Sequence, residues 1–134
     1  MKVLRDDNLI TISYDESLKL LQTFWKAESF QQVQKETVFE IIKEIGSYLV
    51  DYDCDYYLAD QTHRGVVYTV DMQKWIAGVL QEAVLKGNVK KTAIIQPVDF
   101  IVSLSNEQTM NEVTVRADFR AFRDRESALA YLGI

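Results

Sequence analysis

The stretch Cys54–Val70, CDYYLADQTHRGVVYTV, combines a short apolar and aromatic run with a polar loop that leads into a helical pattern. The run Tyr56–Asp60 predicts a strand that ends at an aspartate. In open α/β sheets, ligands and partners bind at the carboxyl ends of the central strands. We therefore expect the binding surface of this chain in the loop that follows the strand. The candidate residues there are Asp60, Gln61, Thr62, His63 and Arg64.

The size and charge of the chain narrow its class. A chain of 134 residues is long enough to bury the core of one domain. Its apolar fraction of 48% and charged fraction of 26% are typical of a globular protein. No linker or internal repeat divides the sequence, which predicts a single domain over residues 1–134. The net charge of −5 creates no global field that attracts nucleic acid, so no nucleic acid partner is expected.

Cysteine usage and the N-terminus bear on the cellular compartment. Cys54 is the only cysteine, which excludes an intramolecular disulfide. Its place before a strand predicts a buried, inert thiol, with a reactive thiol as the alternative. The N-terminal segment MKVLRDDNL has no apolar core of signal-peptide length, and no apolar run approaches a membrane span. We expect a cytoplasmic protein without membrane insertion.

The first part of the chain predicts a hairpin and a helix. Two β-rich runs, Leu9–Tyr14 and Leu18–Trp25, flank Asp15-Glu16-Ser17, whose side chains favour a turn, and together predict an antiparallel hairpin. Apolar residues at helical spacing then predict an amphipathic helix over residues 32–50. These residues are Val38, Ile41, Ile42, Ile45 and Leu49.

A second and clearer helix follows the strand Tyr56–Asp60. Its apolar residues from Met72 to Val84 repeat at intervals of three and four. Asp71 or Thr69 is expected to cap its start, and Gly87-Asn88 to end it by supplying positive φ.

The last third of the chain predicts two strands and two helices. Residues 92–96 (TAIIQ) form a short apolar strand, and a helix begins near Phe100, with a restart at the capping-box residues 105–108. Residues 115–122 alternate as a half-exposed strand, and Asp124 caps the final helix.

The predicted order of elements is β-β-α-β-α-β-α-β-α. Strands separated by helices imply right-handed crossovers and a parallel core, with the opening hairpin as an antiparallel edge. The expected fold is therefore α/β, a single five-stranded mixed sheet, mostly parallel, covered by about four helices.

This order, its lengths and several segments resemble the STAS superfamily, the fold of anti-sigma-factor antagonists, and most closely the small stand-alone SpoIIAA-like bacterial proteins. The resemblance covers nearly the whole chain and is structural rather than catalytic. The segments that carry it are LITISYD (9–15), YYLADQT (56–62), DMQKWI (71–76), KKTAIIQP (90–97), SNEQTMNE (105–112) and FRAFRDRESALAYL (119–132).

The resemblance implies a regulatory module that acts by protein–protein contact. In the sporulation branch of the family, a partner kinase phosphorylates a serine in an Asp-Ser-Ser-Gly type loop before the second helix. The corresponding stretch here, DQTHRG (60–65), is longer and has no serine pair. Thr62 and Thr69 are the hydroxyl residues that could replace that serine, and turn or cap roles for them are the alternative. The fold is also similar to lipid-binding domains of the CRAL-TRIO type.

Motifs for metal, cofactor or catalytic chemistry are weak. The pattern Asp51-x-Asp53-x-Asp55 lacks the glycine and glutamate of a calcium loop. His63 is the only histidine, which excludes a multi-histidine metal site. An Asp60–His63 pair could act as a general base, but no oxyanion-hole motif accompanies it. Phosphate-binding glycine motifs are absent, so no ATP or dinucleotide cofactor is expected.

Two groups of side chains suggest contacts with partners. Arg116, Arg120, Arg123 and Arg125 form a basic run that nearby acidic residues largely neutralise, and protection of an edge strand explains it. Aromatic residues gather around the central strand, where core packing competes with a role in dimerisation or docking. These residues are Tyr48, Tyr52, Tyr56, Tyr57, Tyr68 and Trp75.

We therefore expect a non-enzymatic, STAS-like module that binds a protein partner, with a homodimer as one form of it. Thr69, Asp71 and Trp75 complete the candidate surface begun by residues 60–64, and no catalytic residue, metal or cofactor is expected. The alternative is a small apolar-ligand or lipid-binding protein. Its pocket would be lined by Tyr56, Leu58, Trp75 and Phe100.

Overall fold

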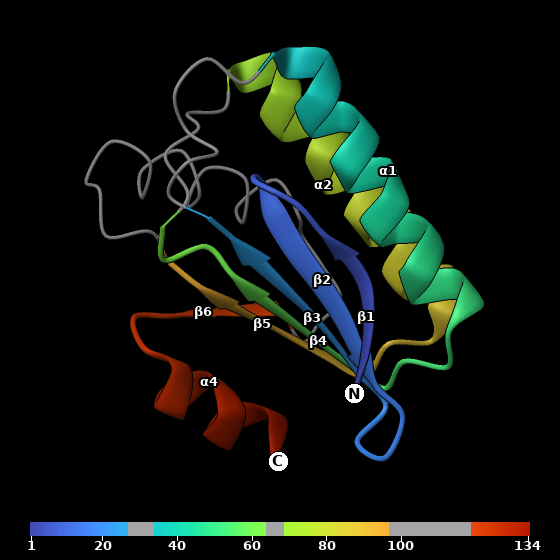
Figure 1. The fold of residues 1–134 in the computed structure, drawn as a ribbon, viewed down its shortest axis with the longest axis vertical. Helices are drawn as coiled ribbons and strands as arrows, with labels where there is room; N and C mark the ends of the chain where they lie inside the picture. Colours follow the sequence, from blue (N-terminus) through green and yellow to red (C-terminus); the bar gives the residue numbers. More distant parts are fainter. Residues whose placement is uncertain (27–33, 64–68, 97–118) are drawn as a thin grey trace.

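The computed structural model describes residues 1–26, 34–63, 69–96 and 119–134. These residues form one six-stranded mixed sheet and three helices (Figure 1). In chain order the elements are β1 (Lys2–Asp6), β2 (Ile10–Asp15), β3 (Leu20–Trp25), α1 (Lys35–Asp51), β4 (Tyr56–Asp60), α2 (Val70–Gly87), β5 (Lys91–Ile95), β6 (Phe119–Phe122) and α4 (Arg125–Leu132).

The strands lie in the sheet in the order of the sequence, from β1 to β6. The pairs β1–β2 and β2–β3 are antiparallel, whereas β3–β4, β4–β5 and β5–β6 are parallel. The strand bounds predicted for β4 are confirmed, and the bounds of β5 are shifted by one residue from the prediction. The predicted antiparallel hairpin is confirmed as β2–β3. Its turn is held by Asp15, whose Oδ1 accepts hydrogen bonds from the backbone N–H groups of Ser17 and Leu18.

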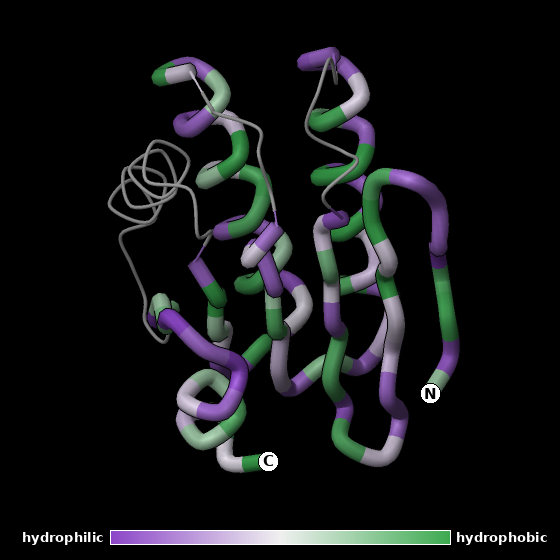
Figure 2. Tube along the Cα trace, turned by 60° about the vertical axis from the view of Figure 1, so that its left-hand side comes forward, coloured by the Kyte–Doolittle hydropathy of each residue, from purple (hydrophilic) through white to green (hydrophobic). Residues whose placement is uncertain are grey.

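Helices α1 and α2 lie side by side on one face of the sheet (Figures 1 and 2). Each helix connects two neighbouring parallel strands and the strand order always advances in one direction, so crossovers of a single hand bring both helices to the same face. Between helices and sheet lies the larger hydrophobic core. Its fully buried members include Ile10, Ile12, Leu21, Ile41 and Leu49.

Helix α4 covers part of the other face, over β4, β5 and β6 (Figure 1). Its buried residues Ala128 and Leu132 pack against Leu20, Leu58 and Ile95 in a second, smaller core. The predicted cap is confirmed, because Oδ1 of Asp124 accepts a 2.7 Å hydrogen bond from the backbone N–H of Ser127.

Strand β1 was not predicted, and with it the described sheet has six strands rather than five. Only Val3 and Leu4 among its five residues are apolar, and the rest are charged, so the sequence shows no alternating pattern (Figure 2, from the label N). As a sheet edge it needs no fully buried side chain, and it carries a register irregularity between Val3 and Arg5.

The ends of α2 refine two predictions. Thr69 is the cap, since its Oγ1 accepts from the backbone N–H of Met72. At the other end Asn88 takes the left-handed conformation with φ of 58°. Gly87 has a different role from the one predicted: a Cβ atom there would lie 2.2 Å from the carbonyl oxygen of Leu49 in α1. Gly87 therefore permits the close approach of two helix ends.

Some predictions fall outside the described residues. These are the helix from Phe100, its restart at residues 105–108, and the first half of the strand 115–122. The predicted helix after that strand is confirmed as α4, and the helix predicted over 32–50 is α1, whose cap position is Gln34. In the part of the chain that the structure describes, no helix has both the length and the apolarity needed to cross a membrane.

Candidate functional site

Asp60 ends β4 on the face of the sheet that carries α4. It is 8% exposed, and its Oδ1 accepts hydrogen bonds from both the backbone N–H (3.0 Å) and the hydroxyl (2.6 Å) of Thr62. This is an Asx-turn, in which the side-chain carboxylate accepts a hydrogen bond from the backbone N–H two residues further along the chain. The carboxylate and the Thr62 hydroxyl thus shape the start of the loop.

Gln61 lies beside this turn and continues the parallel ladder. Its backbone N–H donates to the carbonyl oxygen of Ile95 at 3.0 Å. Its side-chain Oε1 is buried and accepts no hydrogen bond in the described part of the chain. A buried amide oxygen without a donor costs free energy, so this position adds a local instability to the loop.

His63 contacts Phe24, a residue that the sequence did not single out. The two ring centroids are 5.7 Å apart with an edge-to-face angle of 72°. Phe24 pairs in register with Asp60, so it stands on the same face of the sheet. Its side chain is 38% exposed. The β-rich run Leu18–Trp25 predicted this strand, but the sequence could not show which of its two faces the helices leave uncovered.

Arg125 brings the third element to this site. It is the first residue of α4, and its Nη2 donates to Oε1 of Gln22 in β3 at 2.6 Å. Its Nη1 lies 3.9 Å from Oδ2 of Asp60. The Arg125 side chain is 50% exposed, so this weak ion pair remains open to solvent. We name Gln22, Phe24, His63 and Arg125 the Phe24 surface.

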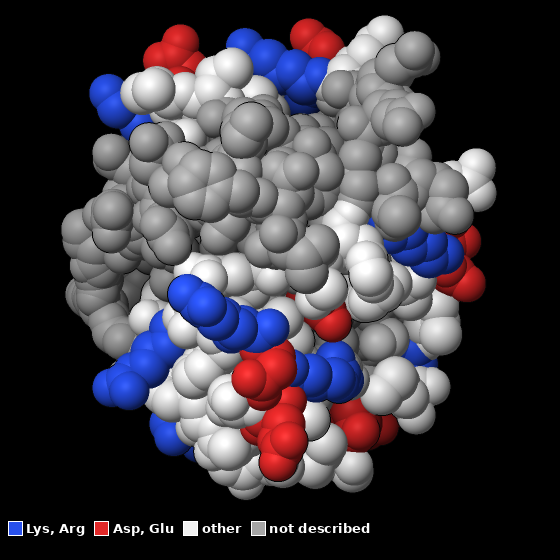
Figure 3. All heavy atoms as spheres, turned by 90° about the vertical axis from the view of Figure 1, so that its left-hand side faces the viewer, with Lys and Arg blue, Asp and Glu red and all other residues white. Residues whose placement is uncertain are grey.

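The charges around α4 do not form a patch of one sign. Arg123 and Arg125 alternate with Asp124 and Glu126 along the chain, and all four are exposed. Figure 3 shows basic and acidic side chains interleaved over the lower half of this side of the molecule. The expected neutralisation of the arginine run is consistent with this view, and β6 is an edge strand among the described strands, as predicted.

The remaining candidates lie elsewhere, at the start of α2. Thr69 is occupied as the helix cap, and Asp71 is exposed in the first turn, where a carboxylate stabilises the positive end of the helix dipole. Trp75 is half-buried, with its ring centroid 4.2 Å from that of Phe39 in α1. The structure therefore separates Trp75 from the Phe24 surface by the thickness of the sheet. Arg64 lies outside the described residues.

The pocket expected for an apolar ligand does not form from its described members. Leu58 is fully buried under α4, whereas Trp75 packs with α1 on the opposite face of the sheet. Tyr56 belongs to the α4 side with Leu58. Side chains on opposite faces of a sheet cannot line one cavity, and Phe100 falls outside the described part of the chain.

Cys54 is buried, as predicted, and burial raises the pKa of its thiol to about 12, with the carboxylates of Asp53 and Asp55 adding to the shift. The thiol is therefore protonated at neutral pH. Within residues 1–26, 34–63, 69–96 and 119–134, no three His, Cys, Asp or Glu side chains are grouped so as to hold a metal ion.

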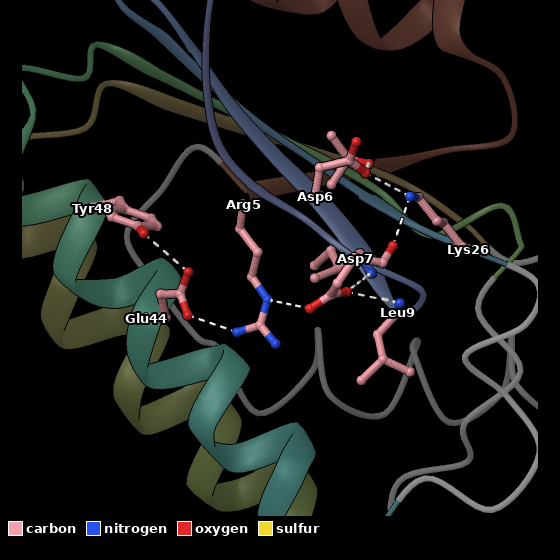
Figure 4. Close-up of polar contacts among 9 residues, drawn as sticks. Arg5, Asp6, Asp7, Leu9, Lys26, Glu44 and Tyr48 are labelled. Atoms are coloured by element: carbon pink, nitrogen blue, oxygen red, sulfur yellow. Dashed lines mark hydrogen bonds and ion pairs between the residues drawn. The ribbon is translucent and has the colours of Figure 1, made fainter.

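A polar network that the sequence did not reveal holds β1 and the following turn (Figure 4). Arg5 donates from Nε to Oδ2 of Asp7 and from Nη1 to Oε1 of Glu44, both at 2.7 Å. Oδ1 of Asp7 accepts from the backbone N–H of Leu9, and Tyr48 donates its hydroxyl to the other oxygen of Glu44. Each charged group is satisfied by several partners inside the chain, which is the arrangement of a structural network.

Comparisons of the chain with protein-family models, with curated proteins and with solved structures find no match. The observations therefore establish a small α/β protein with a mixed six-stranded sheet. The STAS resemblance stays a prediction that rests on the sequence and the order of elements.

Proposed function

We propose that this protein is a non-enzymatic, STAS-like module that acts by binding another protein through the Phe24 surface. The observation that carries the proposal is the exposed Phe24 ring, 38% accessible, beside His63 and a half-exposed arginine on a sheet face that α4 covers only in part. Aromatic residues and arginine are enriched among the residues that dominate binding energy at protein interfaces.

The chemistry of this surface specifies the partner segment. The rings of Phe24 and His63, which meet edge to face, offer an apolar surface large enough to contact about one side chain of a partner. A guanidinium carries five N–H donors, and the contacts of Arg125 with Gln22 and Asp60 leave donors for a further acceptor. The expected partner is therefore a protein segment that presents an apolar side chain next to a carboxylate.

The polar groups at this edge support binding more than catalysis. Asp60 directs one oxygen to Thr62 and the other toward Arg125, while the rings of His63 and Phe24 meet edge to face. A general base needs its carboxylate or imidazole directed at a substrate proton. Here these groups contribute to the shape of the surface instead.

The experiment compares the intact protein with three variants as affinity baits. Phe24→Ser and Arg125→Ala alter the Phe24 surface, and Leu18→Ser is the matched control. Leu18 is exposed to nearly the same extent (41%) but lies in the turn between β2 and β3. Proteins that the wild-type chain retains are identified by mass spectrometry, purified, and titrated against each variant by calorimetry.

We expect a purified partner whose affinity falls by about tenfold or more with Phe24→Ser and with Arg125→Ala, since each change removes a central contact. Leu18→Ser should bind as the wild type does. Equal affinity of all four chains would overturn the proposed surface, and a partner that binds only through other residues would do the same.

A further inference from the structure

Gly78 lies in the middle of α2 on its exposed side, and no contact among the described residues requires a glycine there. A Cβ atom at this position would meet no atom within 4 Å. At Gly46, by contrast, a Cβ would touch Val79 and Ala83, and at Gly87 it would collide with Leu49. Glycine in a helix interior is unfavourable relative to alanine. The open space next to Gly78 therefore points to a partner that approaches the backbone of α2 from outside the chain.

The exposed face of α2 on either side of Gly78 has a regular charge pattern. Asp71 and Lys74 precede the glycine and Glu82 and Lys86 follow it, so the signs run negative, positive, negative, positive. Residues 71, 74, 78, 82 and 85 fall within one narrow strip at 100° per residue, and all five are exposed. Two large apolar side chains, Val70 (61% exposed) and Leu85 (49% exposed), mark the two ends.

We propose that this face binds a second copy of the chain, with the two α2 helices packed antiparallel and a two-fold axis at Gly78. Lys74 and Glu82 each lie four residues from the glycine, so Lys74 of one copy comes level with Glu82 of the other. The same symmetry brings Asp71, seven residues before the glycine, to within one residue of the level of Lys86 of the second copy, eight residues after it, and brings Val70 to within one residue of the level of Leu85. The pattern is self-complementary only in this antiparallel direction, as an isologous contact requires.

The groove between α1 and α2 fits the same arrangement. It has a volume of about 440 Å³, and Gly46, Ser47, Val79 and Ala83 line it together with the charged residues Lys43, Asp51, Glu82 and Lys86. Trp75 lies three residues before Gly78 and faces α1, so in the antiparallel pair it comes level with residue 81 of the second copy. The groove of the second copy lies on this same side. The half-buried Trp75 ring of one copy therefore covers the groove of the other.

The expected association is modest and depends on concentration. An 18-residue helix is about 27 Å long, and one helix pair buries less surface than a standard protein interface. Glu82 also pairs with Lys86 of its own helix at 2.7 Å, but both side chains remain largely exposed, at 65% and 63%. The Phe24 surface lies on the other side of the sheet, so the failure of one proposal would not contradict the other.

The test is sedimentation velocity of the full chain over a range of concentrations, with variants of α2. The wild type should pass from monomer to dimer as concentration rises. Gly78→Arg should remain monomeric, because its side chain fills the crossing point while its Cβ clashes with nothing in the monomer. Lys74→Glu and Glu82→Lys should each weaken the dimer by about tenfold or more, because each places two like-charged pairs in it.

Mixing the two charge variants distinguishes this geometry from any other. In a heterodimer of the Lys74→Glu chain with the Glu82→Lys chain, both inter-copy pairs are again of opposite charge, so the mixture should associate where neither variant does alone. Glu16→Lys, in the exposed turn between β2 and β3, is the charge-reversal control and should dimerise normally. A wild type that stays monomeric throughout, or a dimer indifferent to these α2 changes, would overturn the proposal.

Discussion

Nη1 of Arg5 lies 2.7 Å from Oε1 of Glu44, and this contact joins the edge strand β1 to helix α1. The two residues are 39 positions apart in the sequence. Their side chains are 26% and 28% exposed, so the pair is partly shielded from water. Because Leu4 of β1 is only partly buried against the core, this ion pair adds a specific attachment of the strand to α1.

The first prediction concerns the strength of this attachment. Arg5→Ala should lower the free energy of unfolding by about 1–2 kcal/mol, because it leaves Glu44 and Asp7 without their shared cation. A double-mutant cycle with Glu44→Gln, followed by urea denaturation, should give a coupling of about 0.5–1 kcal/mol. Lys43→Ala serves as the control, since its exposed ammonium lies 4.0 Å from Glu40 and should contribute almost nothing. A coupling of zero would contradict the structural role of the pair.

The second prediction is a loss of stability in acid through Asp7. Burial raises the pKa of Asp7, but the backbone N–H groups of Ile10 and Leu9 and the Arg5 guanidinium outweigh this and hold it below its ordinary value. A lowered pKa in the folded state stabilises the protein above the unfolded pKa of about 3.9. That stability is lost as the pH falls through the lower, folded value.

The Asp7→Asn variant isolates this contribution, because asparagine cannot ionise but can still accept the hydrogen bond from Leu9. Urea denaturation of both chains at several pH values should show a shallower fall in unfolding free energy for the variant below about pH 4. Asp15 and Asp124 also have lowered pKa values and remain in both chains, so they do not affect the difference. Parallel curves for the two chains would exclude Asp7 as a source of acid lability.

The third prediction sets two glycines of α2 against each other. Gly78→Ala should raise the free energy of unfolding by about 1 kcal/mol, because the new methyl group meets nothing and alanine favours the helix. Gly87→Ala should lower it by about 1–3 kcal/mol, because the methyl would lie 2.2 Å from the Leu49 carbonyl oxygen and the helix ends must move apart. Thermal and urea unfolding of dilute samples measures both. Equal effects of the two substitutions would show that the α1–α2 contact at Gly87 is not close.

The fourth prediction concerns the thiol of Cys54. With a pKa of about 12 and an exposure of 1%, only about one molecule in ten thousand carries the thiolate at pH 8. A thiol reagent should therefore react with the native protein far more slowly than with the protein in denaturant. Rapid labelling of Cys54 without denaturant would mean that the segment between α1 and β4 opens readily.

Much of the local structure could be predicted because its causes are local. Thr69 and Asp124 each accept a hydrogen bond from a backbone N–H three residues ahead, and Asp15 holds its turn over a similar distance. Such contacts can be predicted from the type of a residue and from its distance along the chain to its partner. The bounds of strand β4 were predicted correctly, because a short apolar run that ends at an aspartate has few other interpretations.

The proposed Phe24 surface overlaps the candidate residues of the sequence only in part. His63 belongs to both sets, and Asp60 and Thr62 lie beside it because they follow the central strand, but Phe24 and Arg125 were not among the candidates. Arg125 and Gln22 are 103 residues apart, and no pattern of spacing connects them. Trp75 was grouped with the loop because it follows in sequence, yet helix α2 carries it to the opposite face of the sheet.

The sequence by itself determined the identity of the described helices, the β2–β3 hairpin and the mixed character of the sheet, because turn residues, caps and apolar periodicity act within a few residues. Only the tertiary structure decided that β1 joins the sheet, that α1 and α2 share one face, and that α4 leaves Phe24 exposed on the other. These outcomes depend on strand order and on which face each helix buries, which arise from contacts between residues far apart in the chain. For this reason the partners of Arg5 and Arg125 could be identified only after the fold was known.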